Sequence, residues 1–171
     1  MIIEILSHIP RWVFALFFGL LYLGYTQTKT RAVSVTRLVI IPLAMLGLSF
    51  SGVWNTFGSS ILALGCWFGA YALGTATAIS WVSVKEVEYS TETRQFTLPG
   101  SWLPASLMMA IFFTKFIVGM NLVQHPELLE QTRFIAIAGM AYGVFSGIFL
   151  GRMLKIISVH GKHVIRSTFA A

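Results

Sequence analysis

Long runs of apolar residues dominate the chain, and short polar stretches separate them. The runs are about 17 to 25 residues long, the length of a helix that crosses the hydrocarbon core of a bilayer. The pattern predicts an all-α membrane protein, a bundle of about five transmembrane helices forming a single domain over residues 1–171. The predicted spans are residues 9–25, 38–54, 61–81, 103–122 and 133–157.

The segment from residue 82 to residue 102 departs from this pattern, because it is more polar and holds short stretches of extended character. Residues 84–89 and 95–98 are predicted to be strands, and the polar residues 91–94 form the turn between them. We therefore expect a short cytoplasmic β-hairpin between the third and fourth spans. An isolated hairpin is marginally stable in water, so it should pack on helix ends or lipid headgroups.

Composition excludes a soluble globular domain and a disordered chain. The chain is 56% hydrophobic and only 11% charged, whereas an average soluble domain carries roughly 25% charged residues. The formal net charge is +6. In so apolar a chain this excess fits the basic bias of cytoplasmic membrane loops, so no nucleic acid partner is expected.

Basic residues divide unevenly between the two sides of a five-span topology. Nine fall on one side and two on the other. Because basic loops stay in the cytoplasm, this asymmetry predicts an N-terminus outside and a C-terminus in the cytoplasm. The nine are Lys29, Arg31, Arg37, Lys85, Arg94, Arg152, Lys155, Lys162 and Arg166, and the two are Arg11 and Arg133.

The sequence contains no visible catalytic constellation. All six acidic residues are Glu, which removes the Asp-bearing versions of catalytic triads and phosphoryl-transfer centres. Cys66 has no basic neighbour that would activate its thiol, and His160 with His163 is a weak metal signal without further ligands. We expect no enzymatic activity, no cofactor and no metal site.

Glycines recur every four residues in the last span, at Gly139, Gly143, Gly147 and Gly151, and so share one helix face. Such a face allows another helix backbone to approach closely inside a membrane. The third span has a shorter version in Gly65 and Gly69. The partner of the stripe is open: it packs either on the third span of the same chain or on a second protein.

Lys115 is the one ionisable residue well inside a predicted span. One interpretation is that its long side chain extends to the outer interface. The other is that Lys115, with Thr114 and Asn121, binds an anionic or polar ligand inside the bundle, as in a small transporter or channel.

Basic residues near the cytoplasmic ends of the spans are candidates for binding anionic lipid headgroups. The simpler interpretation is that they only control topology. The candidates are Lys29, Arg31, Arg37, Arg152 and Lys155.

Three blocks of sequence carry a resemblance to a known family. They are residues 27–31 with Arg37, Leu38 and Pro42; residues 98–104 with 111–115; and residues 142–152. Over nearly its whole length the chain resembles a family of small proteobacterial integral membrane proteins of unknown function. The resemblance implies a location in the bacterial inner membrane and carries no activity or substrate.

These observations favour a non-enzymatic protein that packs helices, as an accessory subunit or a self-associating protein. Its expected partners are membrane lipids, with a homo-oligomer or a membrane protein as further possibilities. The alternative is the transporter or channel that uses Lys115.

Overall fold

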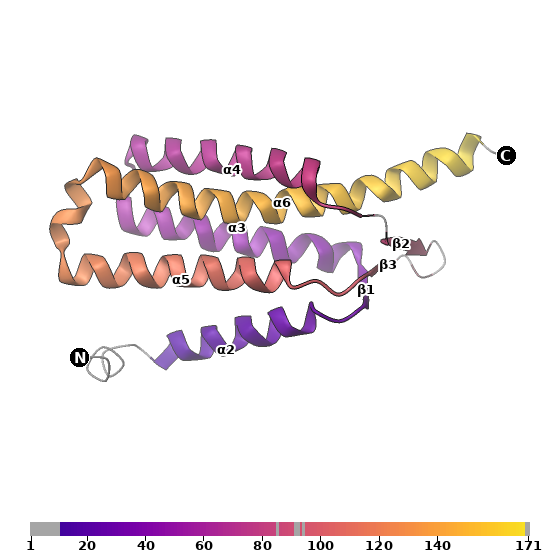
Figure 1. The fold of residues 1–171 in the computed structure, drawn as a ribbon, viewed down its shortest axis with the longest axis horizontal. Coiled ribbons are helices and arrows are strands. Elements are labelled where there is room, and N and C mark those ends of the chain that lie inside the picture. Colours follow the sequence, from indigo (N-terminus) through magenta and orange to yellow (C-terminus); the bar gives the residue numbers. More distant parts are fainter. Residues whose placement is uncertain (1–10, 85, 91–92, 94, 170–171) are drawn as a thin grey trace.

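A computed structural model of the chain shows a bundle of long helices with a small sheet at one end (Figure 1). The structure describes the backbone of residues 11–84, 86–90, 93 and 95–169, and side chains of that set from residue 13 to residue 158. The elements are α2 (Arg11–Thr26), β1 (Arg31–Ser34), α3 (Val35–Phe57), α4 (Ile61–Trp81), β2 (Glu88–Ser90), β3 (Gln95–Leu98), α5 (Leu103–Gln124), the 3-10 helix η1 (Pro126–Glu130) and α6 (Thr132–Phe169).

Four of the five predicted spans are confirmed as helices that are long and apolar enough to cross a membrane. They have mean hydropathies between 1.4 and 1.9. They are Val35–Phe57, Ile61–Trp81, Leu103–Gln124 and Thr132–Ser158.

The first predicted span, residues 9–25, is the exception. Its apolar helix in the described part of the chain runs only over Val13–Thr26, and residues 9 and 10 lie outside the described residues. As described, α2 has 16 residues, or about 24 Å at 1.5 Å per residue, against the roughly 30 Å of a bilayer core.

Side-chain caps explain where the second and third spans begin. Ser34 accepts a hydrogen bond from the backbone N–H of Arg37, so α3 starts three residues before the predicted residue 38. Ser60 caps α4 in the same way through Ala63. Between them, Gly58 ends α3 with a φ of 59°, a left-handed conformation that glycine adopts without steric cost.

The last span is longer than predicted. We expected it to end at residue 157 and to be followed by a tail, but α6 is one helix from Thr132 to Phe169. The basic, polar residues after 157 lower the hydropathy without breaking the helix, because none of them is a proline and only one is a glycine.

The sheet at the end of the bundle has three strands in the order β1-β3-β2, with both pairs antiparallel. The predicted hairpin is confirmed as β2 and β3, although β2 begins at Glu88 and not at residue 84. Of the preceding residues predicted as strand, 84, 86 and 87 are not in a strand, and residue 85 lies outside the described residues. Strand β1 was not predicted. It pairs Arg31 with Leu98, far along the chain, and its four residues show no local strand pattern.

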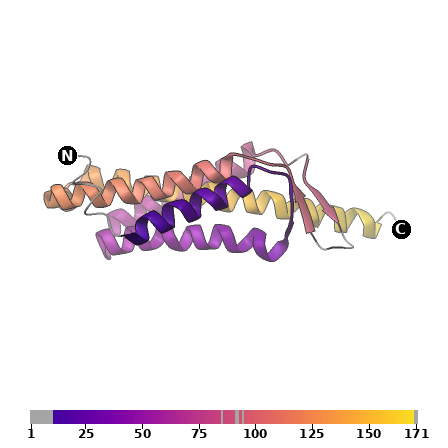
Figure 2. The same ribbon diagram turned by 90° about the horizontal axis from the view of Figure 1, so that it is seen from below.

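Helix α6 is the central element of the bundle and packs against α3, α4 and α5. Figure 2 shows the strands lying alongside its later part. There, Phe96 and Leu98 of β3 share a buried cluster with Met153 and Ile156 of α6. The sheet is thus fixed to the later half of α6 by an apolar contact, as the marginal stability of a free hairpin requires.

Candidate functional site

The glycine stripe of α6 lies directly against α4 of the same chain. A Cβ atom on Gly139 would lie 2.8 Å from the carbonyl oxygen of Ala63, and one on Gly151 would lie 2.5 Å from that of Thr75. A Cβ atom on the two central glycines would overlap α4 carbonyl oxygens outright. These pairs are Gly143 with Trp67, and Gly147 with Tyr71.

The two helices also share a polar contact, because the Thr75 hydroxyl lies 3.2 Å from the carbonyl oxygen of Gly147, as well as 2.8 Å from that of Tyr71 in its own helix. Of the two partners left open by the sequence, the third span of the same chain is the one found against the stripe. A neighbouring protein would find this face already covered.

Gly65 and Gly69 do not take part in this contact, which corrects the sequence interpretation. A Cβ atom on either would meet no atom within 4 Å, so both lie on a different face of α4. Gly74 is the α4 glycine that packs on α6, because a Cβ atom on Gly74 would lie 2.7 Å from the carbonyl oxygen of Val144. The spacing of Ala70, Gly74 and Ala78, all buried, was the signal for this face.

A buried polar cluster joins α3, α4 and α6 and was missed by sequence reasoning. The Trp67 indole Nε1 donates to Ser49 Oγ at 2.9 Å, and that hydroxyl lies 2.8 Å from the carbonyl oxygen of Tyr142. Ser146 Oγ lies 3.2 Å from Ser49 Oγ. Single serines in apolar runs are common, so only the fold reveals that these residues meet.

The Tyr142 hydroxyl is buried beside this cluster and has no hydrogen-bond partner among the described residues. Its ring lies against Gly52 of α3, where a Cβ atom would be 3.0 Å from the ring. The hydroxyl is therefore an unsatisfied polar group in the bundle, which costs free energy in an apolar medium.

Lys115, Thr114 and Asn121 are not brought together as a ligand site. The Thr114 hydroxyl donates to the carbonyl of Ala110, and the Asn121 amide to that of Ile117, so both are bonded within α5 itself. Lys115 is half-buried, about 14 Å along the helix from Gln124 at 1.5 Å per residue. It lines none of the three cavities described in the structure.

At the sheet end of the bundle, three elements direct arginines at one small cavity of about 40 Å³. Arg31 comes from β1, Arg37 from the first turn of α3, and Arg152 from α6. We call this the three-arginine cavity. Burial, followed by the positive charge of Arg37, lowers the pKa of Arg31 from its usual value. Among the described residues no carboxylate pairs with any of the three.

The other two lipid candidates lie outside that cavity. Lys29 Nζ sits 5.1 Å from the centre of the Tyr25 ring, a cation–π contact. Lys155 Nζ donates to the carbonyl oxygen of Ile79 at 2.6 Å, which caps the end of α4.

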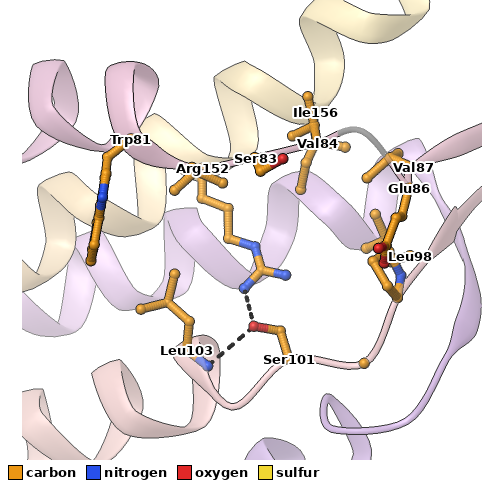
Figure 3. Close-up of a pocket in the computed structure, with 13 residues that line it drawn as sticks. Trp81, Ser83, Val84, Glu86, Val87, Leu98, Ser101, Leu103, Arg152 and Ile156 are labelled. Carbon is orange, nitrogen blue, oxygen red and sulfur yellow. Dashed lines mark hydrogen bonds between the residues drawn. The ribbon is translucent and has the colours of Figure 1, made fainter.

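A larger cavity of about 420 Å³ adjoins the first and shares Arg152, Leu98 and Ile156 with it. We call it the Arg152 cavity. Figure 3 shows the guanidinium of Arg152 reaching from α6 toward Ser101, with the Nη1 atom 3.4 Å from Ser101 Oγ. Sequence reasoning did not single out Ser101 as a site residue, although it belongs to the block of residues 98–104.

Gly100 is the reason that Ser101 reaches this place. The Ser101 N–H donates to the carbonyl of Gln27 at 3.0 Å. This contact draws Gly100 against the carbonyl oxygen of Thr28, where a Cβ atom would overlap that oxygen. The loop before α5 is thereby bonded to the end of α2, and its serine faces α6.

The described residues hold no group of three potential metal ligands. At the opposite end, the exposed His125 and Glu127 pair at 3.0 Å. A hydrogen bond from the backbone N–H of Glu127 itself, followed by one from the His125 side chain, lowers the pKa of that carboxyl. The side chains of His160 and His163 lie outside the described residues.

The fold and these cavities define a class: a helical bundle with four candidate membrane spans, a three-stranded sheet at one end and a basic cavity beside it. The chain belongs to the family of unknown function DUF6622, which matches residues 1–164. No curated protein and no solved structure matches it.

Proposed function

We propose that this chain is a non-enzymatic, multi-pass protein of the bacterial inner membrane, an accessory protein whose basic end binds anionic lipids of the cytoplasmic leaflet. The observation that carries the proposal is the three-arginine cavity. Three separate elements place Arg31, Arg37 and Arg152 together without a described carboxylate partner. Uncompensated cations at the end of a membrane helix bundle attract anionic headgroups.

Orientation is part of the proposal. Arginines and lysines gather at the sheet end, whereas η1 at the other end carries Glu127 and Glu130. The positive-inside bias then assigns the sheet end to the cytoplasm. The exposed rings of Trp81 and Trp102 lie at this end, where α4 stops and α5 starts, as expected for a membrane interface.

An accessory role is favoured over self-association through the glycine stripe, because α4 already covers that stripe. It is also favoured over a transporter built on Lys115, because Thr114 and Asn121 are bonded within α5.

The lipid claim is tested by extracting the full chain from membranes that contain phosphatidylglycerol and phosphatidylcholine, and measuring the lipids that remain bound. We expect enrichment of phosphatidylglycerol that falls as salt rises, because the attraction is electrostatic. The double variant Arg31→Gln/Arg37→Gln should reduce the enrichment, and Arg133→Gln at the opposite end is the matched control. Equal retention of both lipids by the wild type would contradict the proposal.

The orientation is tested by labelling single cysteines with a membrane-impermeant maleimide, in a Cys66→Ser background. Thr93→Cys reports on the hairpin turn and Glu130→Cys on the opposite end, and both positions are exposed. We expect intact cells to be labelled at residue 130 and not at residue 93. Labelling at residue 93 would overturn the orientation.

A further inference from the structure

The Arg152 cavity has groups of both charges on its walls. It lies where the end of α4, the later half of α6, the start of α5 and the hairpin meet (Figure 3). Its volume of about 420 Å³ leaves room for more than a few waters. The residues that matter below are Trp81, Glu86, Ser101, Leu103 and Arg152.

One wall is equipped to hold an oxyanion. Ser101 Oγ accepts from the Leu103 N–H at 3.3 Å and from Arg152 Nη1 at 3.4 Å. Because both contacts use the oxygen as acceptor, the hydroxyl proton remains available to a ligand. Arg152 has four further N–H donors, and a guanidinium binds phosphate oxygens with two parallel hydrogen bonds.

Positive charge behind this wall strengthens it. Arg31 and Arg37 line the adjoining three-arginine cavity together with Arg152, so three like charges lie close together and repel one another. No described carboxylate forms an ion pair with Arg152. A bound phosphodiester would relieve this repulsion while satisfying the free donors.

The opposite side of the cavity carries a negative charge. Glu86 lines it with an exposed carboxylate, and Figure 3 places that side chain beside Leu98, across from Arg152. Trp81 stands at the rim and is 87% exposed. Exposed tryptophans favour the headgroup layer, so the cavity opens at the depth of lipid headgroups.

We propose that the Arg152 cavity binds a phosphoethanolamine group, the headgroup of a zwitterionic phospholipid. Its phosphodiester lies on Arg152 and Ser101, and its primary ammonium faces Glu86. This inference rests on the proposed function only because both place the sheet end at a membrane surface. The lipid differs, since the proposed function concerns anionic lipids and this cavity takes a zwitterionic headgroup. A purely anionic headgroup would leave Glu86 unmatched, and the trimethylated amine of phosphatidylcholine has no N–H to donate to a carboxylate.

The experiment uses the full chain in nanodiscs that contain equal amounts of phosphatidylethanolamine, phosphatidylcholine and phosphatidylglycerol. Native mass spectrometry then counts the lipids retained per chain after detergent release. We expect one retained phosphatidylethanolamine. Arg152→Gln should reduce this retention roughly tenfold, the value of one charge-assisted hydrogen bond. Glu86→Gln should abolish the preference for phosphatidylethanolamine over phosphatidylglycerol.

Matched controls separate the cavity from general electrostatics. Glu88→Gln removes an exposed carboxylate of the hairpin that does not line the cavity, and Arg133→Gln removes an exposed cation at the opposite end of the bundle. Neither variant should change the amount of phosphatidylethanolamine that each chain retains. Arg152→Lys keeps the charge without the planar fork and should retain an intermediate amount. Glu86→Gln alters only an exposed side chain, so it keeps the test valid if Arg152→Gln does not fold.

Each outcome bears on one of the two proposals. Retention of phosphatidylethanolamine that is unchanged in Glu86→Gln and Arg152→Lys would overturn this inference. Retention of phosphatidylglycerol equal to that of phosphatidylethanolamine would also overturn this inference. That result would still agree with the proposed function, in which the basic end binds anionic lipids. Displacement by water-soluble phosphoethanolamine at millimolar concentration would support the headgroup chemistry but identify a soluble ligand as the source. Failure of the salt-dependent enrichment described above contradicts the proposed function alone.

Discussion

Gly143 of α6 faces the backbone carbonyl oxygen of Trp67 in α4 so closely that a single methyl group on Gly143 would overlap that oxygen. Backbone atoms of a helix cannot move aside as the end of a flexible side chain can. Gly147 and Tyr71 repeat this relationship one turn later. This close contact between α4 and α6 therefore depends on the absence of side chains.

Gly143→Ala should destabilise the protein by about 1–3 kcal/mol, because the helices must separate or bend to admit the methyl group. Gly65→Ala is the matched control, since a Cβ atom there meets open space. That variant should be neutral or more stable by about 0.5–1 kcal/mol, from the higher helix propensity of alanine. Reversible unfolding in detergent measures both. Equal effects at the two sites would refute the packing argument.

The native mass of Gly143→Ala tests whether this contact lies within one chain or between chains. Because α4 of the same chain covers the stripe, we expect the variant to keep the assembly size of the wild type. A smaller assembly would show that the stripe also joins neighbouring proteins.

Ser49→Ala should cost about 1–2 kcal/mol of stability. The substitution removes the acceptor of the Trp67 indole N–H and leaves that donor buried without a partner. Ser51→Ala is a suitable control, because the Ser51 hydroxyl donates only to Leu48 within its own helix. The ultraviolet resonance Raman signal of the indole reports directly on the lost hydrogen bond. An unchanged signal would contradict the assignment.

Tyr142→Phe should be neutral or stabilising, by up to about 1 kcal/mol. It removes a buried hydroxyl that has no partner among the described residues and keeps the ring against Gly52. Unfolding of the two proteins under the same conditions gives the difference. A loss of more than about 1 kcal/mol would mean that the hydroxyl holds a bound water or another group.

Lys115→Leu should raise stability by about 1–3 kcal/mol, because a charged group at this depth of a span is costly. Lys115→Arg keeps a long cationic side chain and should stay close to the wild type. Stability and lipid retention are measured together. Loss of a bound anion in the Leu variant, without any gain in stability, would favour the ligand interpretation of Lys115.

Gly100→Ala should destabilise the loop before α5 and weaken lipid retention in the Arg152 cavity. A Cβ atom would overlap the carbonyl oxygen of Thr28 and displace Ser101. Gly119→Ala is the control, since it meets no atom within 4 Å. We expect at least a severalfold loss of retained phosphatidylethanolamine at residue 100 and none at residue 119. The lipid assay described above provides the measurement, and equal retention in both variants would rule out a positioning role for the loop.

The sequence by itself determined the long helices and the hairpin of this protein, but neither β1 nor the full length of α6. Hydrophobic runs of spanning length predicted four long helices closely, with the third predicted at Ile61–Trp81, because helix formation in an apolar run depends on local composition. The polar interruption at residues 82–102 predicted the hairpin. The small-residue stripe predicted close packing, since glycines four apart share one face whatever the fold.

Only the tertiary structure decided which elements meet. No local pattern reveals that β1 pairs with β3, that Ser49 lies beside Trp67, or that Gly74 rather than Gly65 faces α6. Arg152 likewise meets Arg31 and Arg37, more than 100 residues earlier in the chain, at one cavity. Periodicity is a property of neighbouring residues, whereas the choice of partner is settled by the packing of complete surfaces. The candidate site depends on the choice of packing partners, because its residues come close to one another only when the helices and strands pack together.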